Sequence, residues 1–435
     1  MTGLQTLLAR TALGGAAATA TVLLPRFRPA FHCSPRRFRM WYLIAFAAIR
    51  LLLFSVVFLD LRIAPRGDLP GIYIGEIKAH LAGGVPYRTY ATSYAPLFPY
   101  LYGALYRLAP SPLTLIIFSI LVEVATAAIF LRFMPRVLTE AQVRIAALLC
   151  LANPISLQFV TIDGQNNVLI ALFLALALLW FAEKREALSG AAVGLSIVSV
   201  KFLPLLFTPV FPMFLRRRAA AWIATCGAVV VAVYGYFDWV LHAPVLQALR
   251  REGQIKSAGG LPFLVEAITG RDLGRIGWDA LLLLALAAVL ATGWCRARAV
   301  EPGSRSALRA ATFLLPALLL TLMALGKKTW PTYTEMVLFP LGMVVATCVG
   351  EDAAGTVRSR ALWLFGVFSL LCVTAHSVWS SLLSQANAVT VHLLLSVGYG
   401  AAWLLLLLEL GLFATYAALT RLCLRQAGLA VPDRS

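Results

Sequence analysis

Long apolar runs recur along this chain from residue 40 almost to its C-terminus. Each run holds about 20 residues, and a helix of that length crosses the ~30 Å hydrocarbon layer of a bilayer. The 435 residues have a mean hydropathy of +0.84, and only 13% of them are charged. We therefore predict an all-α polytopic transmembrane bundle of about 11–13 spans. The expected spans are 40–60, 112–131, 142–161, 167–181, 187–200, 203–215, 219–240, 277–295, 308–325, 333–348, 361–383 and 389–420.

These spans divide the chain into three parts. Residues 1–39 form a basic cytoplasmic segment, in which Thr11 to Leu24 is either a leader or an extra helix. Residues 40–420 form a single transmembrane domain, and residues 421–435 a cytoplasmic tail. The aromatic stretch Ala95 to Leu108 is too short for a span, so we expect a re-entrant or tilted helix there.

The net charge is +18, which in a soluble protein would favour nucleic acid as a partner. Here the Lys and Arg residues flank apolar segments, so membrane lipids are the expected partners and nucleic acid is not. The seven cysteines form no C-x-x-C pair, and the five histidines lack the spacing of metal ligands. We predict no metal and no cofactor.

Short loops rich in Lys and Arg stay on the cytoplasmic side during insertion. Placing the basic segment before residue 40 inside puts the loops with Arg132, Arg216 and Arg296 inside as well. The unusual polar motifs then all fall on the extracytoplasmic face of the cell membrane. They are residues 67–105, the stretch "TIDGQNN" (161–167), Lys201, the loop 241–276 and the stretch "GKKTWPTY" (326–333).

The first of these motifs begins with "GDLPGIYIGEIKAHLAGG". In it, Ile74, Ile77 and Leu81 recur at helical spacing, which predicts an amphipathic helix at the membrane interface. The following "VPYRTYATSYAPLFPYLY" supplies Tyr and Pro at headgroup depth. Composition alone fits an aromatic belt equally well.

The order of the motifs is more specific than any one of them. A span, an outer acidic residue, "GGVPYR" and "YAPLFPYLY" are followed by a Pro-containing span, "DGQNN", a Lys before Pro, and "KKTWPTYTEMVLFPL". This arrangement resembles the GT-C superfamily of integral-membrane glycosyltransferases over most of residues 40–350, especially bacterial members that use polyprenyl-phosphate sugars. Family members often carry acidic residues where this chain has Thr89 and Ser93, which leaves the sugar and the acceptor open.

The resemblance implies transfer of a sugar, with mannose or a pentose suiting it, from a polyprenyl-phosphate donor. The acceptor would be an extracytoplasmic glycolipid, glycan or protein. Such transfer needs a carboxylate base for the acceptor hydroxyl and cations for the departing phosphate. Asp68 is the predicted base, and Asp60 is the second candidate.

Further residues are candidates for substrate binding. Short cytoplasmic loops normally carry the excess of Lys and Arg, so two adjacent lysines on the outer face suggest an anionic ligand there. For the donor phosphate we nominate Lys327 and Lys328, with Lys201 second; lipid phosphates would explain the lysines equally well. Sugar hydroxyls and rings would contact Gln165, Asn166, Asn167, Tyr87, Tyr94 and Tyr333, although helix capping and interface anchoring are alternative roles.

Two other classes of function fit the same chain. A flippase or transporter of lipid-linked sugars would also be polytopic and basic, and a non-catalytic assembly subunit would tolerate changes at Asp68 and the lysines. Arg50 and Glu123 are charged residues within spans, and we expect them to pair, either as a packing device or with a direct role.

Overall fold

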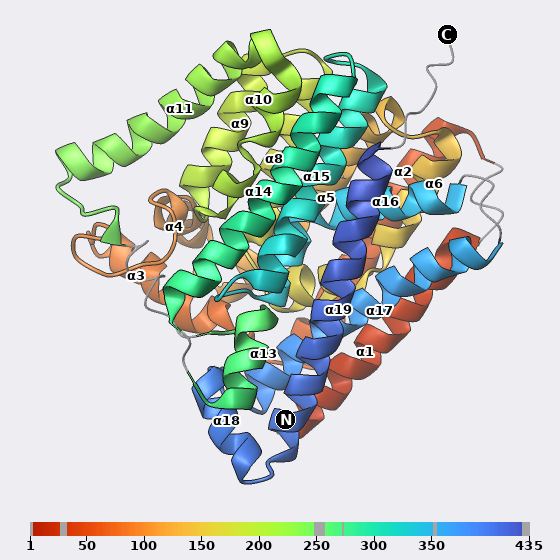
Figure 1. Cartoon of the computed structure of the whole chain (residues 1–435). Coiled ribbons are helices and arrows are strands. Elements are labelled where there is room, and N and C mark those ends of the chain that lie inside the picture. The colour runs from red at the N-terminus through yellow and green to blue at the C-terminus, as the bar shows by residue number, and fades with distance from the viewer. Residues whose placement is uncertain (1–2, 27–32, 248–256, 272–273, 351–354, 429–435) are drawn as a thin grey trace. The chain divides into compact units, whose positions relative to one another are not determined.

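A computed structural model describes residues 3–26, 33–247, 257–271, 274–350 and 355–428 (Figure 1). These ranges are helical and contain no strand, only isolated bridges at Pro86–Tyr90 and Ala258–Lys328. The α-helices are α1 (Gly3–Leu23), α2 (Pro35–Phe54), α3 (Ile74–Leu81), α4 (Phe98–Leu108), α5 (Pro112–Phe133), α6 (Glu140–Leu151), α7 (Pro154–Ser156), α8 (Asn167–Ala182), α9 (Glu186–Ser199), α10 (Val210–Leu215), α11 (Ala219–Gly235), α13 (Gly260–Thr269), α14 (Arg275–Ala299), α15 (Arg305–Leu325), α16 (Leu338–Gly350), α17 (Gly355–Ser381), α18 (Ala388–Ser396) and α19 (Gly400–Gly428).

Shorter helical turns of other kinds join or extend these helices. The π-helical turns are Ser55–Asp60, Leu69–Tyr73, Leu157–Ile162 and Tyr236–Val240. The 3₁₀ turns are Leu24–Arg26, Met134–Arg136, Leu203–Phe207, Arg216–Arg218 and Pro331–Val337.

Within the described ranges, nine helices are long and apolar enough to cross a membrane, or ten if the bent pair Glu140–Leu151 and Pro154–Ile162 is one span. This confirms the predicted all-α polytopic class, with fewer candidate spans in the described ranges than the 11–13 expected. Helices α8 and α9 are apolar but shorter. The expected span over residues 203–215 is not one continuous α-helix: a 3₁₀ turn begins at Leu203, with Pro204 in its first turn, and α10 follows after Pro209. Both belong to the longer candidate span Leu203–Val240.

The internal contacts group the chain into two compact units. Unit 1 comprises residues 1–42, 137–158 and 255–435, and unit 2 comprises residues 43–136 and 159–254. Each unit is assembled from segments that are distant in the sequence. In unit 1, α15 and α16 form the most buried part.

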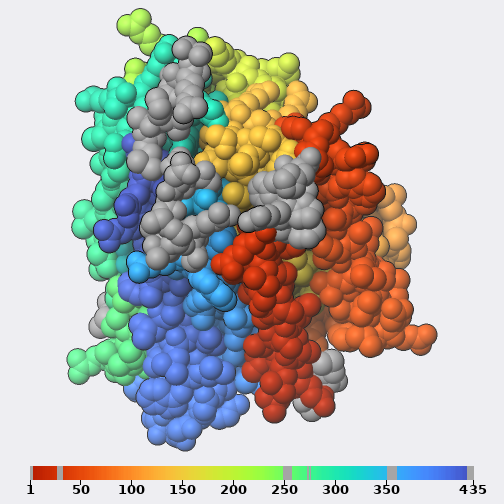
Figure 2. All heavy atoms as spheres, turned by 90° about the vertical axis from the view of Figure 1, so that its right-hand side faces the viewer, coloured from red at the N-terminus to blue at the C-terminus, as the bar shows by residue number. Residues whose placement is uncertain are grey.

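Residues 11–24, for which the sequence allowed either a leader or an extra helix, lie in α1 of unit 1 except for Leu24, which begins the following 3₁₀ turn. Helix α1 packs along α17, as the red and blue atoms in Figure 2 show. Small residues allow this close approach: a Cβ at Gly366 of α17 would lie 2.6 Å from Val22 Cγ2. With its short extension, α1 has the length and hydropathy of a membrane span.

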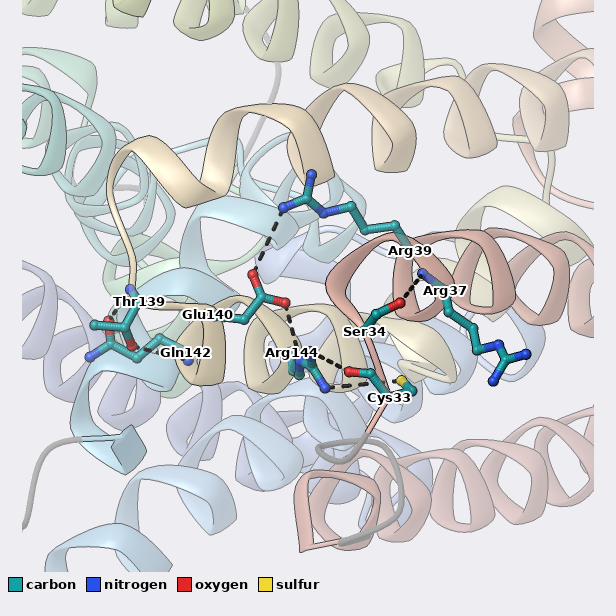
Figure 3. Close-up of polar contacts among 8 residues, drawn as sticks. All are labelled: Cys33, Ser34, Arg37, Arg39, Thr139, Glu140, Gln142 and Arg144. Carbon is teal, nitrogen blue, oxygen red and sulfur yellow. Dashed lines mark hydrogen bonds and ion pairs between the residues drawn. The ribbon is translucent and has the colours of Figure 1, made fainter.

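The basic stretch before residue 40 is bonded to α6, also within unit 1 (Figure 3). Arg144 donates from Nη2 to the Cys33 carbonyl at 2.8 Å and from Nε to Glu140 Oε1 at 3.1 Å. The other Glu140 oxygen lies 3.8 Å from Arg39 Nη2. A capping box at Thr139 begins α6, which orients Glu140 and Arg144 one turn apart.

Unit 2 is built on the neighbouring helices α5, α8, α9 and α11. Two glycines one turn apart bring α9 against α11, since a Cβ at Gly190 would lie 2.3 Å from the Trp222 carbonyl oxygen. At Gly194 a Cβ would lie 2.9 Å from Val229 Cβ. Glycines spaced by four residues allow such close packing of helices in membranes.

The predicted pairing of Arg50 with Glu123 is confirmed. Arg50 Nε donates to Glu123 Oε2 at 2.6 Å, and Arg50 Nη1 donates to the Phe46 carbonyl at 3.0 Å. Both charged side chains are buried. The pair therefore fixes α2 against α5 in unit 2.

Candidate active site

Asp68 starts the site in unit 2. The chain turns at Gly67, which has φ +77°, and Asp68 then caps the π-helical turn Leu69–Tyr73 that leads into α3. The half-buried carboxylate accepts a hydrogen bond at Oδ2 from Gln165 Nε2 at 3.4 Å. Its other oxygen, Oδ1, has no donor among the described residues. One carboxylate oxygen is thus held in place while the second is free to accept a proton.

Gln165 is held by a second bond from the same turn. Tyr73 Oη donates to Gln165 Oε1 at 2.9 Å, and the Gln165 backbone N–H donates to the Phe159 carbonyl at 2.8 Å. Burial, aided by Tyr94 and Asp68, raises the pKa of Tyr73. The phenol therefore stays protonated, which fixes the amide orientation and aims its N–H₂ group at Asp68.

The loop 161–167 reaches Asp68 because of one glycine. Gly164 has φ +60°, and a Cβ there would lie 2.9 Å from Ile116 Cγ1 and 3.0 Å from Leu69 Cδ2. Leu69 directly follows Asp68, so the absence of a side chain at residue 164 lets the polar loop pack on the turn that carries the carboxylate.

The loop itself is polar and buried. Asp163, Gln165, Asn166 and Asn167 are all nearly inaccessible to solvent. The side-chain amide of Asn166 has no hydrogen-bond partner at either Nδ2 or Oδ1 among the described residues. Unpaired buried polar atoms are costly, so the donor and acceptor of the Asn166 side chain are candidates to bind a polar ligand.

Lys201 brings a cation to the same loop. It follows the end of α9, and its Nζ donates to Asn167 Oδ1 at 3.2 Å and lies 5.4 Å from the centroid of the Tyr94 ring. The Tyr94 ring in turn packs edge-on to Tyr73, with centroids 5.4 Å apart. Asp68, Tyr73, Tyr94, Gln165, Asn167 and Lys201 thus form one network, which we call the Asp68–Lys201 network.

Backbone hydrogen bonds fix Tyr94 against the end of α9. The Ala95 N–H donates to the Val200 carbonyl at 2.9 Å, and the Leu97 N–H donates to the Val198 carbonyl at 3.1 Å. Three of the motifs predicted to share one membrane face therefore meet in unit 2. Which side of the membrane they face stays a prediction.

Tyr87, expected either to stack on a sugar or to anchor the interface, is buried by its neighbours in this structure. Its ring is 3% exposed and packs with Phe237 and Ala243, while its hydroxyl donates to the Tyr94 carbonyl. Burial raises the pKa of Tyr87 above its ordinary value. Its contribution to the network is to position Tyr94.

Sequence reasoning missed Tyr73 and Glu76. Glu76 Oε2 accepts from Thr92 Oγ1 at 2.8 Å, and that hydroxyl also accepts from the Tyr94 backbone N–H at 3.0 Å. Glu76 is thus a second half-buried carboxylate beside the network. The sequence signal for Glu76 was a carboxylate on the same predicted helix as the apolar Ile74 and Ile77.

Lys327, Lys328 and Tyr333 belong to unit 1. Lys327 Nζ lies 3.7 Å from Oε1 of the buried Glu266, and its carbonyl accepts from the Ala258 N–H at 3.0 Å. Tyr333 is buried in the 3₁₀ turn Pro331–Val337. An internal carboxylate therefore already offsets one of the two lysine charges.

The described residues contain no group of three His, Cys, Asp or Glu side chains suited to a metal ion. Asp60, the second candidate base, is exposed at the end of the π-helical turn Ser55–Asp60. No hydrogen bond or ion pair joins Asp60 to the Asp68–Lys201 network in the described part of the chain.

Residues 92–244 match the sequence model of glycosyltransferase family 87. This segment contains Tyr94, the 161–167 loop and Lys201, while Asp68 and Tyr73 precede it. The match confirms the resemblance to glycosyltransferases that the motif order predicted.

Comparison with solved structures gives a crystal structure of ArnT from Cupriavidus metallidurans bound to undecaprenyl phosphate. The likeness has a TM-score of 0.47 at 14% sequence identity and covers 88% of this chain and 77% of ArnT. No curated protein matches the chain.

Proposed function

We propose that this protein transfers a sugar from a polyprenyl-phosphate donor to an extracytoplasmic acceptor, with Asp68 as the general base. The observation that carries the proposal is the Asp68–Lys201 network, which joins an available carboxylate oxygen, amide groups and a cation. Its amides and its cation lie in the segment that matches a glycosyltransferase family, and Asp68 precedes that segment. The acceptor is a glycolipid, a glycan or a protein, and mannose or a pentose suits the sugar.

In the proposed reaction, the acceptor hydroxyl attacks the anomeric carbon while Asp68 Oδ1 takes its proton. The bond between that carbon and the donor phosphate oxygen breaks, and the polyprenyl phosphate leaves with the electron pair. Gln165 holds the second carboxylate oxygen, so that Oδ1 faces the acceptor. Lys201 offsets the growing charge on the phosphate.

The amides of the buried loop would bind the sugar. The side chain of Asn166 offers a donor and an acceptor without partners among the described residues, which suits hydroxyl groups. Asn167 instead orients Lys201. Tyr94 packs against both Tyr73 and Phe98, so its proposed stacking on the sugar rests on the sequence argument.

Lys327 and Lys328 are proposed to bind the donor phosphate on the sequence argument. Removing Lys327 would leave the Glu266 carboxylate buried without its partner, so Lys328→Ala is the cleaner variant. A charge-assisted hydrogen bond is worth about 1.5–3 kcal/mol, which corresponds to more than tenfold weaker donor binding. Unchanged donor binding by Lys328→Ala in nanodiscs would remove this residue from the site.

The predicted orientation can be tested by labelling. Gly71 is exposed with nothing within 4 Å of its Cβ position, whereas Ala187 lies in a loop predicted to be cytoplasmic. In a background without native cysteines, Gly71→Cys should react with an impermeant thiol reagent in intact cells, and Ala187→Cys should not. The reverse pattern would overturn the orientation.

A deletion strain tests the transfer reaction against the flippase alternative. Loss of a transferase should let a polyprenyl-phosphate sugar accumulate in the outer leaflet, where impermeant periodate can oxidise it. Loss of a flippase should leave the accumulated lipid protected from periodate. Accumulation that is protected, or no accumulation at all, would contradict the proposal.

A further inference from the structure

A groove of about 540 Å³ opens along α14, α15 and α19, which lie side by side in unit 1 (Figure 1). Its apolar part is lined by Ala324 of α15 and by Phe413 and Ala417 of α19. Its other end is lined by Arg296 of α14 and by Arg421 and Arg425 of α19. From Phe413 to Arg425 the helix rises about 18 Å, so the groove runs along the helix axis for much of one leaflet.

One wall of the groove is a single face of α19. Positions 413, 417, 421 and 425 follow one another at four-residue spacing and share one face of the helix. The end of the helix is anchored elsewhere: Gln426 Oε1 accepts from Arg309 Nη2 at 2.9 Å, and Gln426 Nε2 donates to Cys348 Sγ at 3.3 Å. Small side chains at Ala324 and Ala417 leave the volume open.

Three guanidinium groups gather at one end of this groove. The Arg296 guanidinium lies against the end of α19, with Nη2 2.5 Å from the Cβ position of Gly428. Arg421 and Arg425 are one helical turn apart, where like charges destabilise a helix. No hydrogen bond or ion pair joins any of the three to another residue in the described part of the chain.

Other arginines of the same unit are bonded within the protein. Arg305 Nε donates to the Val137 carbonyl at 3.2 Å, and Arg144 and Arg309 have the partners given above. The three groove arginines are exposed instead. Their charge is therefore directed at a ligand or at the membrane surface.

We propose that the groove binds an anionic phospholipid of the bilayer. The phosphate lies among Arg296, Arg421 and Arg425, and an acyl chain follows the apolar wall past Ala417 to Phe413. Exposure of α14 supports a lipid occupant, because only 11% of the apolar stretch within Ile276–Ala299 is buried in the protein. A free phosphate would leave the apolar wall empty, and a zwitterionic lipid would not offset three positive charges.

This site is separate from the proposed transfer reaction. The sequence places the Arg296 loop and the C-terminal arginines on the cytoplasmic side, where anionic lipids attract basic residues. Binding there stabilises the folded protein by mass action, so the melting temperature reports it without an activity assay.

The test uses the full chain, purified in detergent, with phosphatidylglycerol, phosphatidylcholine or glycerol phosphate added. Phosphatidylglycerol should raise the melting temperature, and the other two should not. Replacing Arg296, Arg421 and Arg425 together by Gln should weaken phosphatidylglycerol binding about fivefold for each arginine, which is about a hundredfold for all three. Ala417→Trp fills the apolar part and should weaken binding with the charges intact.

Control variants separate this groove from general basicity. The control replaces three other arginines of a predicted cytoplasmic loop, as Arg216→Gln, Arg217→Gln and Arg218→Gln together. It removes the same charge and should leave phosphatidylglycerol binding unchanged. If the triple groove variant does not fold, Arg421→Gln alone should still weaken binding about fivefold. The proposal would be overturned if phosphatidylcholine or glycerol phosphate bound as well as phosphatidylglycerol. It would also be overturned if the control variant lost as much binding as the groove variant, or if the groove preferred a polyprenyl phosphate to phosphatidylglycerol.

Discussion

Gly164→Ala should impair both the stability of unit 2 and sugar transfer. With φ +60°, residue 164 lies in the left-handed region, where a non-glycine residue costs about 1–2 kcal/mol. The new Cβ would also lie 2.9 Å from Ile116 Cγ1 and 3.0 Å from Leu69 Cδ2. Overpacking of this kind costs about 1–3 kcal/mol, so the total is about 2–5 kcal/mol.

The contact with Leu69 links this cost to the site, because relieving it shifts the turn that carries Asp68. The melting temperature in detergent and the transfer rate should therefore both fall. Gly227→Ala is the matched control: it lies within α11 with nothing within 4 Å of its Cβ position, and Ala favours a helix there. A Gly164→Ala protein with the melting temperature and rate of the native chain would refute this reasoning.

Three further predictions concern single contacts. Arg50→Met should cost about 3–5 kcal/mol by leaving the buried Glu123 carboxylate unpaired, and adding Glu123→Leu should recover melting temperature; no recovery would contradict a pairing role. Bonds from neighbouring arginines lower the pKa of Glu183, so its stabilisation is complete above the unfolded pKa of about 4.3 and is lost as pH falls through the lower folded value. Glu183→Gln should make the free energy of unfolding depend less on pH over that acid range. An unchanged dependence on pH would argue against this role of Glu183. Tyr73→Phe should cost about 0.5–1.5 kcal/mol and reduce transfer, whereas Tyr90→Phe, whose hydroxyl has no partner among the described residues, should not; equal effects would remove Tyr73 from the site.

Much of the fold could be predicted from hydropathy. Apolar runs predicted the positions of most long helices, because burial in lipid demands apolar residues regardless of tertiary contacts. The expected span 389–420 was wrong as a single helix, since it forms α18 and α19. The weakly apolar residues 11–24 were ambiguous, since the helix α1 depends on packing against α17. The segment 203–215 was expected to be a span of its own, but it is divided into a 3₁₀ turn and α10 and forms part of the longer candidate span Leu203–Val240.

The site was predictable only in part. Asp68, Gln165 and Lys201 were nominated from motifs, but the bond between Asp68 and Gln165 joins residues 97 positions apart and has no local signature. Glu266 and Lys327 illustrate the same limit. The sequence predicted an anionic ligand for Lys327, and the structure places the buried Glu266 carboxylate 3.7 Å from its Nζ. Tyr73 was not singled out in the sequence, and only its hydrogen bond to Gln165 reveals a role.

The most direct test of the proposed function is the transfer rate of the purified Asp68→Asn protein, measured with a polyprenyl-phosphate sugar donor and an acceptor extract. The substitution keeps the size of the side chain but removes the proton acceptor, so donor binding should persist while the rate falls about 10²–10⁴-fold. Asp60→Asn, which changes an exposed carboxylate, should retain nearly the full rate. A near-native rate for Asp68→Asn, with transfer lost instead in Asp60→Asn, would contradict the assignment of Asp68 as the base.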